Sequence, residues 1–313
     1  MVYEKYQSLF GIEWDGREEQ IKTGVKHYRI KVIRSGNMVE FELYPVWDTK
    51  NRQRTKSAAP TREAQERLNK ENTRKKITRW VNHNFGRGDL FVTLTYEDGK
   101  RPPMPEQAKK DIVNFLRRVK DYRRRRGLPE PKYLYVIEYG ALDQMKRPMK
   151  IHTHVVLSGG MDRDALEQLW KGGRANSKRL QPNDFELEGI SRYICKLPAG
   201  GRQWAKSRNL VPPEVKYPKH RVSNRRAVLI ARDIETARDA LRRQFPKLRL
   251  LEVQVKTSDY CAGAYLYAKM RFDEPNAGFE RCRSGAAYAP PLRRKSRDRD
   301  TRPQGKRTRT IFM

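Results

Sequence analysis

Two histidines, His152 and His154, lie two residues apart in the apolar run IHTHVVLSG. Because side chains alternate across a β-strand, both imidazoles would leave one face while Ile151 and Val155 point to the other. Two imidazoles at this spacing can bind one divalent cation, and a carboxylate from a neighbouring strand would complete a three-ligand site open to substrate. Glu138 is the candidate, because its strand YLYVIE is otherwise apolar and an unpaired charge buried there would be costly.

Tyr193 and Lys196 form a second candidate pair in the segment GISRYICKLP. On a helix these two positions are neighbours on one face. A phenol, with a reference pKa of about 10, needs help to act as a nucleophile. Lys196 could favour the phenolate or hold a phosphodiester that the metal polarises. The pair therefore indicates phosphodiester chemistry at a tyrosine.

The elements around these residues alternate between strands and helices. The patterns predict strands at 91–96, 133–140 and 151–159, a possible edge strand at 173–181, and helices at 105–126, 162–170 and 184–197. The order strand, helix, strand, strand, helix, strand, helix predicts an α+β fold. We expect an antiparallel central sheet with helices on one face, of ferredoxin-like character.

The segments on either side of this core are more basic. Residues 27–47 alternate around a Ser-Gly-Asn turn, which predicts a β-hairpin. The pattern from Thr61 to about Trp80 predicts a helix that lies on the surface or along DNA, with a solvated linker helix as the alternative. Residues 201–221 are interpreted as a loop or extended arm, and a helix at 234–244 and a strand at 248–256 follow.

The charge balance points to a polyanionic partner. The 313 residues contain 69 Lys and Arg against 37 Asp and Glu, a net charge of +32. Such a balance is typical of nucleic-acid binding and is not needed by an enzyme of small metabolites. Three widely spaced cysteines speak against a disulfide scaffold or a zinc ribbon and favour the reducing cytoplasm. No window is apolar enough for a transmembrane helix, so we expect no membrane association.

Several basic residues are candidates for DNA contacts. We expect those on the 105–126 helix to reach phosphates, and those after 201 to guide a single strand past the metal and tyrosine centre. The candidates are Arg117, Arg123, Arg124, Arg125, Arg126, Lys206 and Arg208.

The motifs FVTLTY, IHTHVVLSG and YICK, in this order, resemble the three motifs of the HUH replication initiators of rolling-circle plasmids and phages, over residues 86–210. Thr153 stands between the histidines, so the match is to HxH. The resemblance implies that the first motif, with Thr93 and Thr95, helps to form the origin-binding surface. It implies that His152 and His154 bind Mg²⁺ or Mn²⁺, with Glu138 as the acidic ligand. Tyr193 would cut single-stranded DNA, leaving a 5′-phosphotyrosine and a free 3′-hydroxyl, and Lys196 matches the motif's lysine.

The resemblance divides the chain into four parts. These are a basic N-terminal hairpin and helix at 1–85, an endonuclease domain at 86–200, a basic accessory region at 201–274 and a disordered basic tail at 275–313. Tyr260, Tyr265 and Tyr267 could supply another nucleophile but are more typical of packing residues.

The leading hypothesis is a metal-dependent strand transferase that nicks single-stranded or hairpin origin DNA. No Walker motif occurs in the sequence, so we expect a host helicase and a host polymerase as partners. The first alternative is a non-catalytic protein that binds DNA or RNA through its basic segments. The second is an HUH relaxase or a single-tyrosine transposase. The sequence assigns no oligomeric state.

Overall fold

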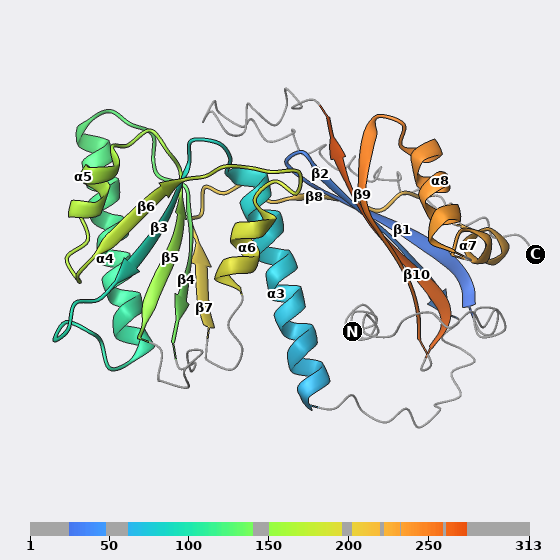
Figure 1. Cartoon of the computed structure of the whole chain (residues 1–313), viewed down its shortest axis with the longest axis horizontal. Helices are drawn as coiled ribbons and strands as arrows, with labels where there is room; N and C mark the ends of the chain where they lie inside the picture. The colour runs from blue at the N-terminus through green and yellow to red at the C-terminus, as the bar shows by residue number, and fades with distance from the viewer. Residues whose placement is uncertain are drawn as a thin grey trace, which may run out of the picture.

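The computed structural model describes residues 25–47, 62–139, 150–195, 202–219, 222–231, 233–258 and 261–273. They form an α+β fold with two five-stranded antiparallel sheets, which confirms the predicted fold class (Figure 1). The predicted tail at 275–313 lies outside the described residues. None of the described helices is long and apolar enough to cross a membrane.

The first sheet is built from the strands that the motifs predicted. Its order is β6 (Ala175–Arg179), β3 (Leu90–Thr95), β5 (His152–Leu157), β4 (Tyr133–Glu138) and β7 (Arg202–Lys206). The edge strand β6 was expected. By contrast, β7 falls in a segment that was interpreted as a loop or arm, and it pairs with β4 at the other edge.

One face of this sheet holds the larger core. Alternation turns Leu90, Val92 and Leu94 toward α4 (Pro105–Arg125), whose buried stripe includes Ile112 and Phe115. The short helix α5 (Arg163–Gln168) packs on the same core and begins at Asp162, whose side chain accepts a hydrogen bond from a backbone N–H in the first turn. This face therefore anchors the sheet and leaves its other face for chemistry.

The opposite face is also covered in part, which adds a detail to the expected helices on one face. Leu134, Val136 and Val156 present apolar side chains there and pack against α3 (Arg62–Asn84) and α6 (Glu188–Ile194). Exposed apolar strand residues would be costly, so two helices cover this half of the face. The other half of the face holds the polar motif residues.

The second sheet joins distant parts of the chain. Its order is β8 (Glu214–Lys216), β1 (Val25–Ser35), β2 (Met38–Trp47), β10 (Cys261–Phe272) and β9 (Leu248–Ser258). The predicted hairpin forms β1 and β2, with Gly36 at φ 66° in the turn, a conformation that favours glycine. Helices α7 (Asn224–Ile230) and α8 (Ile234–Gln244) cover the apolar face of this sheet (Figure 1).

Helix α3 lies between the two sheets, so it is neither the surface helix nor the DNA arm that its scattered charges suggested (Figure 1). Its C-terminal half packs Ile77 and Val81 on the first sheet. Toward the second sheet, Arg79 donates two hydrogen bonds to Glu40, at 2.8 and 2.6 Å, and one to Glu42 at 3.3 Å. The charge of α3 is therefore matched by buried carboxylates on β2.

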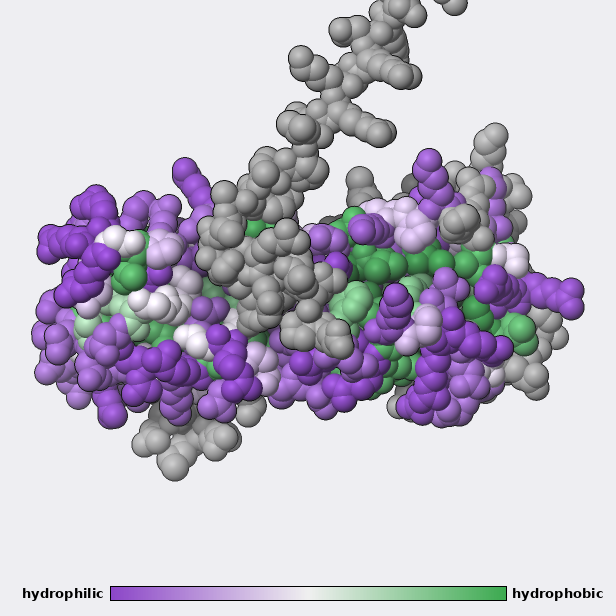
Figure 2. All heavy atoms as spheres, turned by 90° about the horizontal axis from the view of Figure 1, so that it is seen from above, coloured by the Kyte–Doolittle hydropathy of each residue, from purple (hydrophilic) through white to green (hydrophobic). Residues whose placement is uncertain are grey.

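The molecular surface reflects the basic composition. Figure 2 shows hydrophilic side chains over most of the half that holds the first sheet. Hydrophobic side chains are visible on the half that holds the second sheet, where Leu229 of α7 and Ile234 of α8 are exposed.

We predict that Arg79→Met lowers the free energy of unfolding by about 3–5 kcal/mol at pH 7, because it leaves Glu40 and Glu42 buried without their guanidinium partner. Burial acts to raise the pKa of Glu40, but Arg79 outweighs it and lowers this pKa from 4.5 to about 2. The pair therefore stabilises the protein fully above pH 4.5 and loses its effect as the pH falls toward 2.

Urea unfolding at pH 7 and at about pH 4 measures this effect. Without Arg79, burial raises the pKa of Glu40, so protonation relieves the buried charge and the deficit shrinks at the lower pH. Arg74→Met on the same helix is the control, because Arg74 pairs with the half-exposed Glu71 and its loss should cost under about 1 kcal/mol. Equal losses for the two variants would contradict the assignment.

Candidate metal and tyrosine site

Strand register brings the three predicted metal ligands together. Glu138 on β4 lies directly opposite His152 on β5, and His154 lies one alternation further along the same face. The Glu138 Oε2 atom is 3.0 Å from His152 Nε2 and 3.7 Å from His154 Nε2. The ligand atoms of the three side chains all lie within 4.8 Å of one another. We call these three residues the triad.

Hydrogen bonds fix the direction of both imidazoles. His152 Nδ1 is 3.0 Å from the Lys150 carbonyl oxygen, which can only accept, so this nitrogen carries the proton and Nε2 keeps its lone pair for a metal. His154 Nδ1 is 3.2 Å from the hydroxyl of Thr93 on the neighbouring strand β3. In both rings, Nε2 points toward Glu138. This arrangement of outer partners is typical of histidines that bind metals.

The protonation equilibria show how strongly the triad is coupled. Burial acts to raise the pKa of Glu138, but hydrogen bonds from His152 and His154 outweigh it and lower that pKa. Burial acts to lower the pKa of His152, but the hydrogen bonds to Glu138 and to the Lys150 carbonyl outweigh it and raise that pKa. Without a metal, a second proton on His152 supplies the positive charge that the carboxylate needs.

The donor set fits a divalent cation. Glu138 is nearly buried, and its Oε1 atom is buried without a hydrogen-bond partner. A buried carboxylate oxygen of this kind is costly unless a cation or another donor satisfies it. Two imidazoles and one carboxylate suit a transition metal such as Mn²⁺, whereas Mg²⁺ prefers oxygen ligands. The triad therefore has the chemistry of a metal site with positions left for substrate.

Helix α6 places Tyr193 beside the triad. Ser191 and Ile194 are buried on its packing face, whereas Tyr193 on the other face is 58% exposed. The Tyr193 ring lies 5.3 Å from the His154 ring, in an edge geometry, and 6.1 Å from Phe91. The phenol is therefore adjacent to the ligands and still open to solvent.

The predicted helix at 184–197 is shorter in the structure. It begins at Glu188 and ends at Ile194, because Glu186 takes a φ of 53°, which breaks a right-handed helix. Lys196, the predicted partner of Tyr193, lies outside the described residues.

The remaining predicted site residues fall into two groups. On the triad face, Thr93 contacts His154, and the Thr95 hydroxyl donates to the Arg174 carbonyl. Lys206 on β7 lies with its ammonium 3.9 Å from the Trp80 ring centroid. Arg208 follows β7 and is exposed.

The predicted phosphate contacts of α4 lie on the other face of the sheet. Arg123 is 3% exposed and donates to the carbonyls of Pro129, Ser158 and Gly159, so it holds loops together and is not available to DNA. Around it, Arg124 pairs with Asp121, and Arg126 stacks on Tyr122. The exposed positions on this helix include Arg117, Arg124, Arg125 and Arg126.

Three contributions to the site were missed at the sequence level. Phe91 stacks on His154 at 5.3 Å, which the period of two from Thr93 could have indicated. Trp204 lies opposite Val136 on the triad face, because β7 joins the sheet. Lys178 on β6 lies opposite Phe91 and is exposed on the same face. No local pattern reveals the last two contacts, since each depends on which strand pairs at a sheet edge.

Residues 89–197 match the model of a protein family described as replication-associated protein ORF2. The match covers β3 to α6 and includes the triad and Tyr193. It confirms the resemblance to rolling-circle replication initiators and indicates a role in replication initiation. Comparisons with curated proteins and with solved structures found no match.

We predict that Mn²⁺ raises the unfolding temperature and that His154→Ala abolishes this response, because a ligand that binds only the folded state stabilises it. At a concentration 100-fold above Kd the gain is about 2.7 kcal/mol. Differential scanning calorimetry with and without Mn²⁺ provides the measurement.

Glu97→Gln serves as the control, since Glu97 is an exposed carboxylate paired only with surface Lys100 in the described contacts. Thr93→Val should weaken Mn²⁺ binding by roughly tenfold, because it removes the group that orients His154. A wild-type protein that is indifferent to Mn²⁺ would contradict the metal site.

Proposed function

Starting from the family match of residues 89–197, we propose that this protein is a metal-dependent endonuclease and strand transferase that initiates rolling-circle replication in the cytoplasm. Its substrate is single-stranded or hairpin origin DNA of a plasmid or phage. The observation that carries the proposal is the contact between the exposed Tyr193 phenol and His154 of the buried triad.

The proposed reaction is a transesterification. The Tyr193 Oη attacks the scissile phosphorus and loses its proton, the bond from phosphorus to the 3′ oxygen breaks, and that oxygen takes up a proton. The products are a 5′-phosphotyrosine and a free 3′-hydroxyl that a polymerase can extend. A bound divalent cation supplies charge that polarises the phosphate. Glu138, His152 and His154 hold that cation, and Lys150 and Thr93 orient the two rings.

Several features of the triad face suit a single strand. Basic side chains lie at both edges of the sheet, with Lys178 on β6 and Lys206 on β7. Between them, Phe91 and Trp204 offer aromatic surface, and such surfaces bind unpaired bases by stacking. A strand that crosses this face would pass over the triad and beside Tyr193.

Two alternatives keep part of this interpretation. A non-catalytic nucleic-acid-binding protein would use the same basic surface without a covalent step, but it would leave the buried carboxylate of Glu138 without a function. A relaxase or transposase would use the same chemistry on a different DNA site. The family match favours the initiator, and mapping the cleaved site to a replication origin separates these biological roles. A host helicase and a host polymerase complete the proposed cycle.

We predict that the protein forms a denaturant-resistant adduct with a single-stranded oligonucleotide from its own origin in the presence of Mn²⁺. Tyr193→Phe should abolish the adduct, because the phenyl ring has no attacking oxygen. Denaturing electrophoresis with labelled DNA measures it. Tyr217→Phe is a matched control, since Tyr217 is 60% exposed, close to the 58% of Tyr193.

An adduct that persists in Tyr193→Phe at the wild-type level would reject Tyr193 as the nucleophile. A wild-type protein that binds origin DNA tightly but forms no adduct would favour the non-catalytic alternative.

We also predict that Lys178→Ala weakens the binding of single-stranded DNA and lowers the slope of log K against log salt by about 0.7, the value for one lost phosphate contact. Fluorescence anisotropy over a range of salt concentrations measures both. Lys110→Ala provides the comparison, because Lys110 is exposed on α4, which covers the other face of the sheet. Equal effects of the two changes would contradict a DNA path across the triad face.

A further inference from the structure

Helix α6 is too short to hold itself in place. It has seven residues, and isolated helices of fewer than about 12 residues are marginal in water. Its position must therefore come from contacts with other elements. On the side of α3, the Leu187 backbone N–H donates to the Asn82 side chain at 3.0 Å. On its other side, the contacts come from the second sheet.

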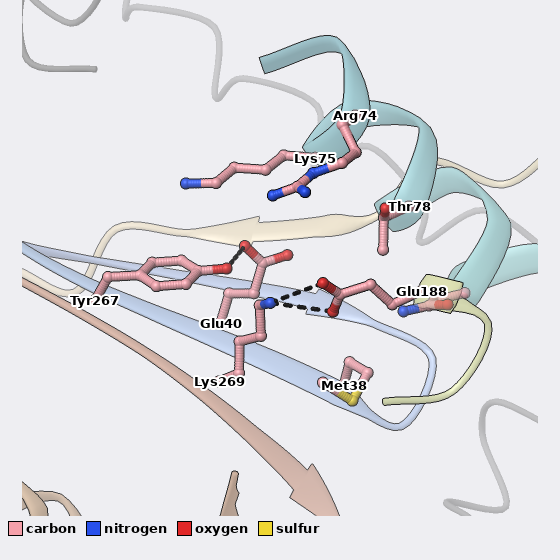
Figure 3. Close-up of a pocket in the computed structure, with 9 residues that line it drawn as sticks. Met38, Glu40, Arg74, Lys75, Thr78, Glu188, Tyr267 and Lys269 are labelled. Atoms are coloured by element: carbon pink, nitrogen blue, oxygen red, sulfur yellow. Dashed lines mark hydrogen bonds and ion pairs between the residues drawn. The ribbon is translucent and has the colours of Figure 1, made fainter. Parts of the chain in front are cut away.

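Lys269 of β10 reaches across to α6. Its ammonium lies 3.0 Å from each carboxylate oxygen of Glu188, the first residue of the helix. Figure 3 shows the Lys269 side chain extending from the sheet to Glu188, with Glu40 and Tyr267 beside it. The pair is largely removed from water, with side-chain exposures of 12% and 7%. Lys269 is also 2.9 Å from Glu252 of β9, so it joins both strands to the helix.

A second set of contacts holds the residues just before α6. Arg271, two positions along β10, donates to the Asn183 carbonyl at 3.0 Å and lies 3.2 Å from the Glu186 carboxylate. Asn37, in the β1–β2 turn, donates to the same carboxylate at 3.2 Å. Among the described residues, Glu186 alone combines a side chain with a positive φ, a conformation that costs energy and persists where the surroundings hold it.

We propose that Lys269 and Arg271 of β10 are positioning residues, which set the place of Tyr193 against the triad by fixing the start of α6. Glu188 and Tyr193 belong to the same short helix, so a shift or tilt at Glu188 moves the phenol. The inference rests on the proposed function of Tyr193. It assigns to the second sheet a part in the cleavage step itself, in addition to any contact with DNA.

The cleavage rate should be sensitive to this contact. A displacement of about 1 Å at the reacting atoms can reduce a rate by 100-fold, because in-line attack requires close approach and alignment. The triad would be unaffected, since β3, β4 and β5 hold it within the first sheet. Loss of the contact is therefore expected to lower the rate of the chemical step and to leave metal binding unchanged.

The test compares single-turnover adduct formation in Lys269→Met and wild type, at saturating origin oligonucleotide and Mn²⁺. We expect the rate to fall about 10- to 100-fold, while Kd for the oligonucleotide and for Mn²⁺ stays within about twofold. Lys269→Arg should restore most of the rate, because it keeps a cation within reach of Glu188. Hydrogen exchange supplies a readout that does not depend on activity, and the amides of residues 191–195 should exchange faster in Lys269→Met.

Lys31→Met is the matched control. Lys31 forms a buried ion pair with Glu42 at 3.2 Å that joins β1 to β2 within the same sheet. Its loss should lower stability in a similar way but leave the adduct rate within about twofold. Glu188→Gln removes the other end of the contact while preserving shape, so it tests the inference if Lys269→Met does not fold.

The outcomes separate the two proposals. A Tyr193-dependent adduct that forms at the wild-type rate in Lys269→Met or Glu188→Gln would overturn the positioning role and leave the proposed function intact. An equal loss of rate in Lys31→Met would also overturn it, because the effect would then follow stability. If the wild type forms no Tyr193-dependent adduct, the proposed function fails. Hydrogen exchange then decides whether β10 orders α6, and unchanged exchange would overturn the positioning role as well.

Discussion

A carboxylate that is removed from water needs a positive partner, and this requirement organises the described structure. Glu40 and Glu42 on β2 receive the guanidinium of Arg79 from α3. Glu188 at the start of α6 receives Lys269 from β10. Each pair joins two elements that are distant in the sequence, so the requirement for neutralisation also fixes their relative position.

Glu138 meets the same requirement in a different way. Its nearest partners in the described structure are two imidazoles, which are positive only when protonated. One of its oxygens remains buried without a donor. A divalent cation neutralises the carboxylate and uses the lone pairs of both rings, whereas a lysine or arginine would satisfy the charge and occupy the site. Within the described part of the chain no such side chain pairs with Glu138, and this leaves the triad suitable for a metal.

The positive charge of the chain thus has several uses. Some of it is internal, as with Arg79, Lys269 and the buried Arg123, and stabilises the arrangement of elements. Some is exposed on the triad face, where it can attract a single strand. The net charge alone indicated a polyanionic partner but did not distinguish these groups, because a count of side chains says nothing about which of them are buried.

The sequence by itself determined the α+β class, the motif strands and the grouping of Glu138, His152 and His154, because alternation along a strand is a local property that sets which side chains share a face. It could not show that α3 is buried between two sheets, that β7 and β10 are strands, or that Arg123 points into loops. Those outcomes depend on pairing between distant segments, where each strand edge accepts whichever partner buries the most apolar surface and satisfies its hydrogen bonds. The place of Tyr193 against His154 belongs to the same group, since a seven-residue helix takes its position from the sheets around it.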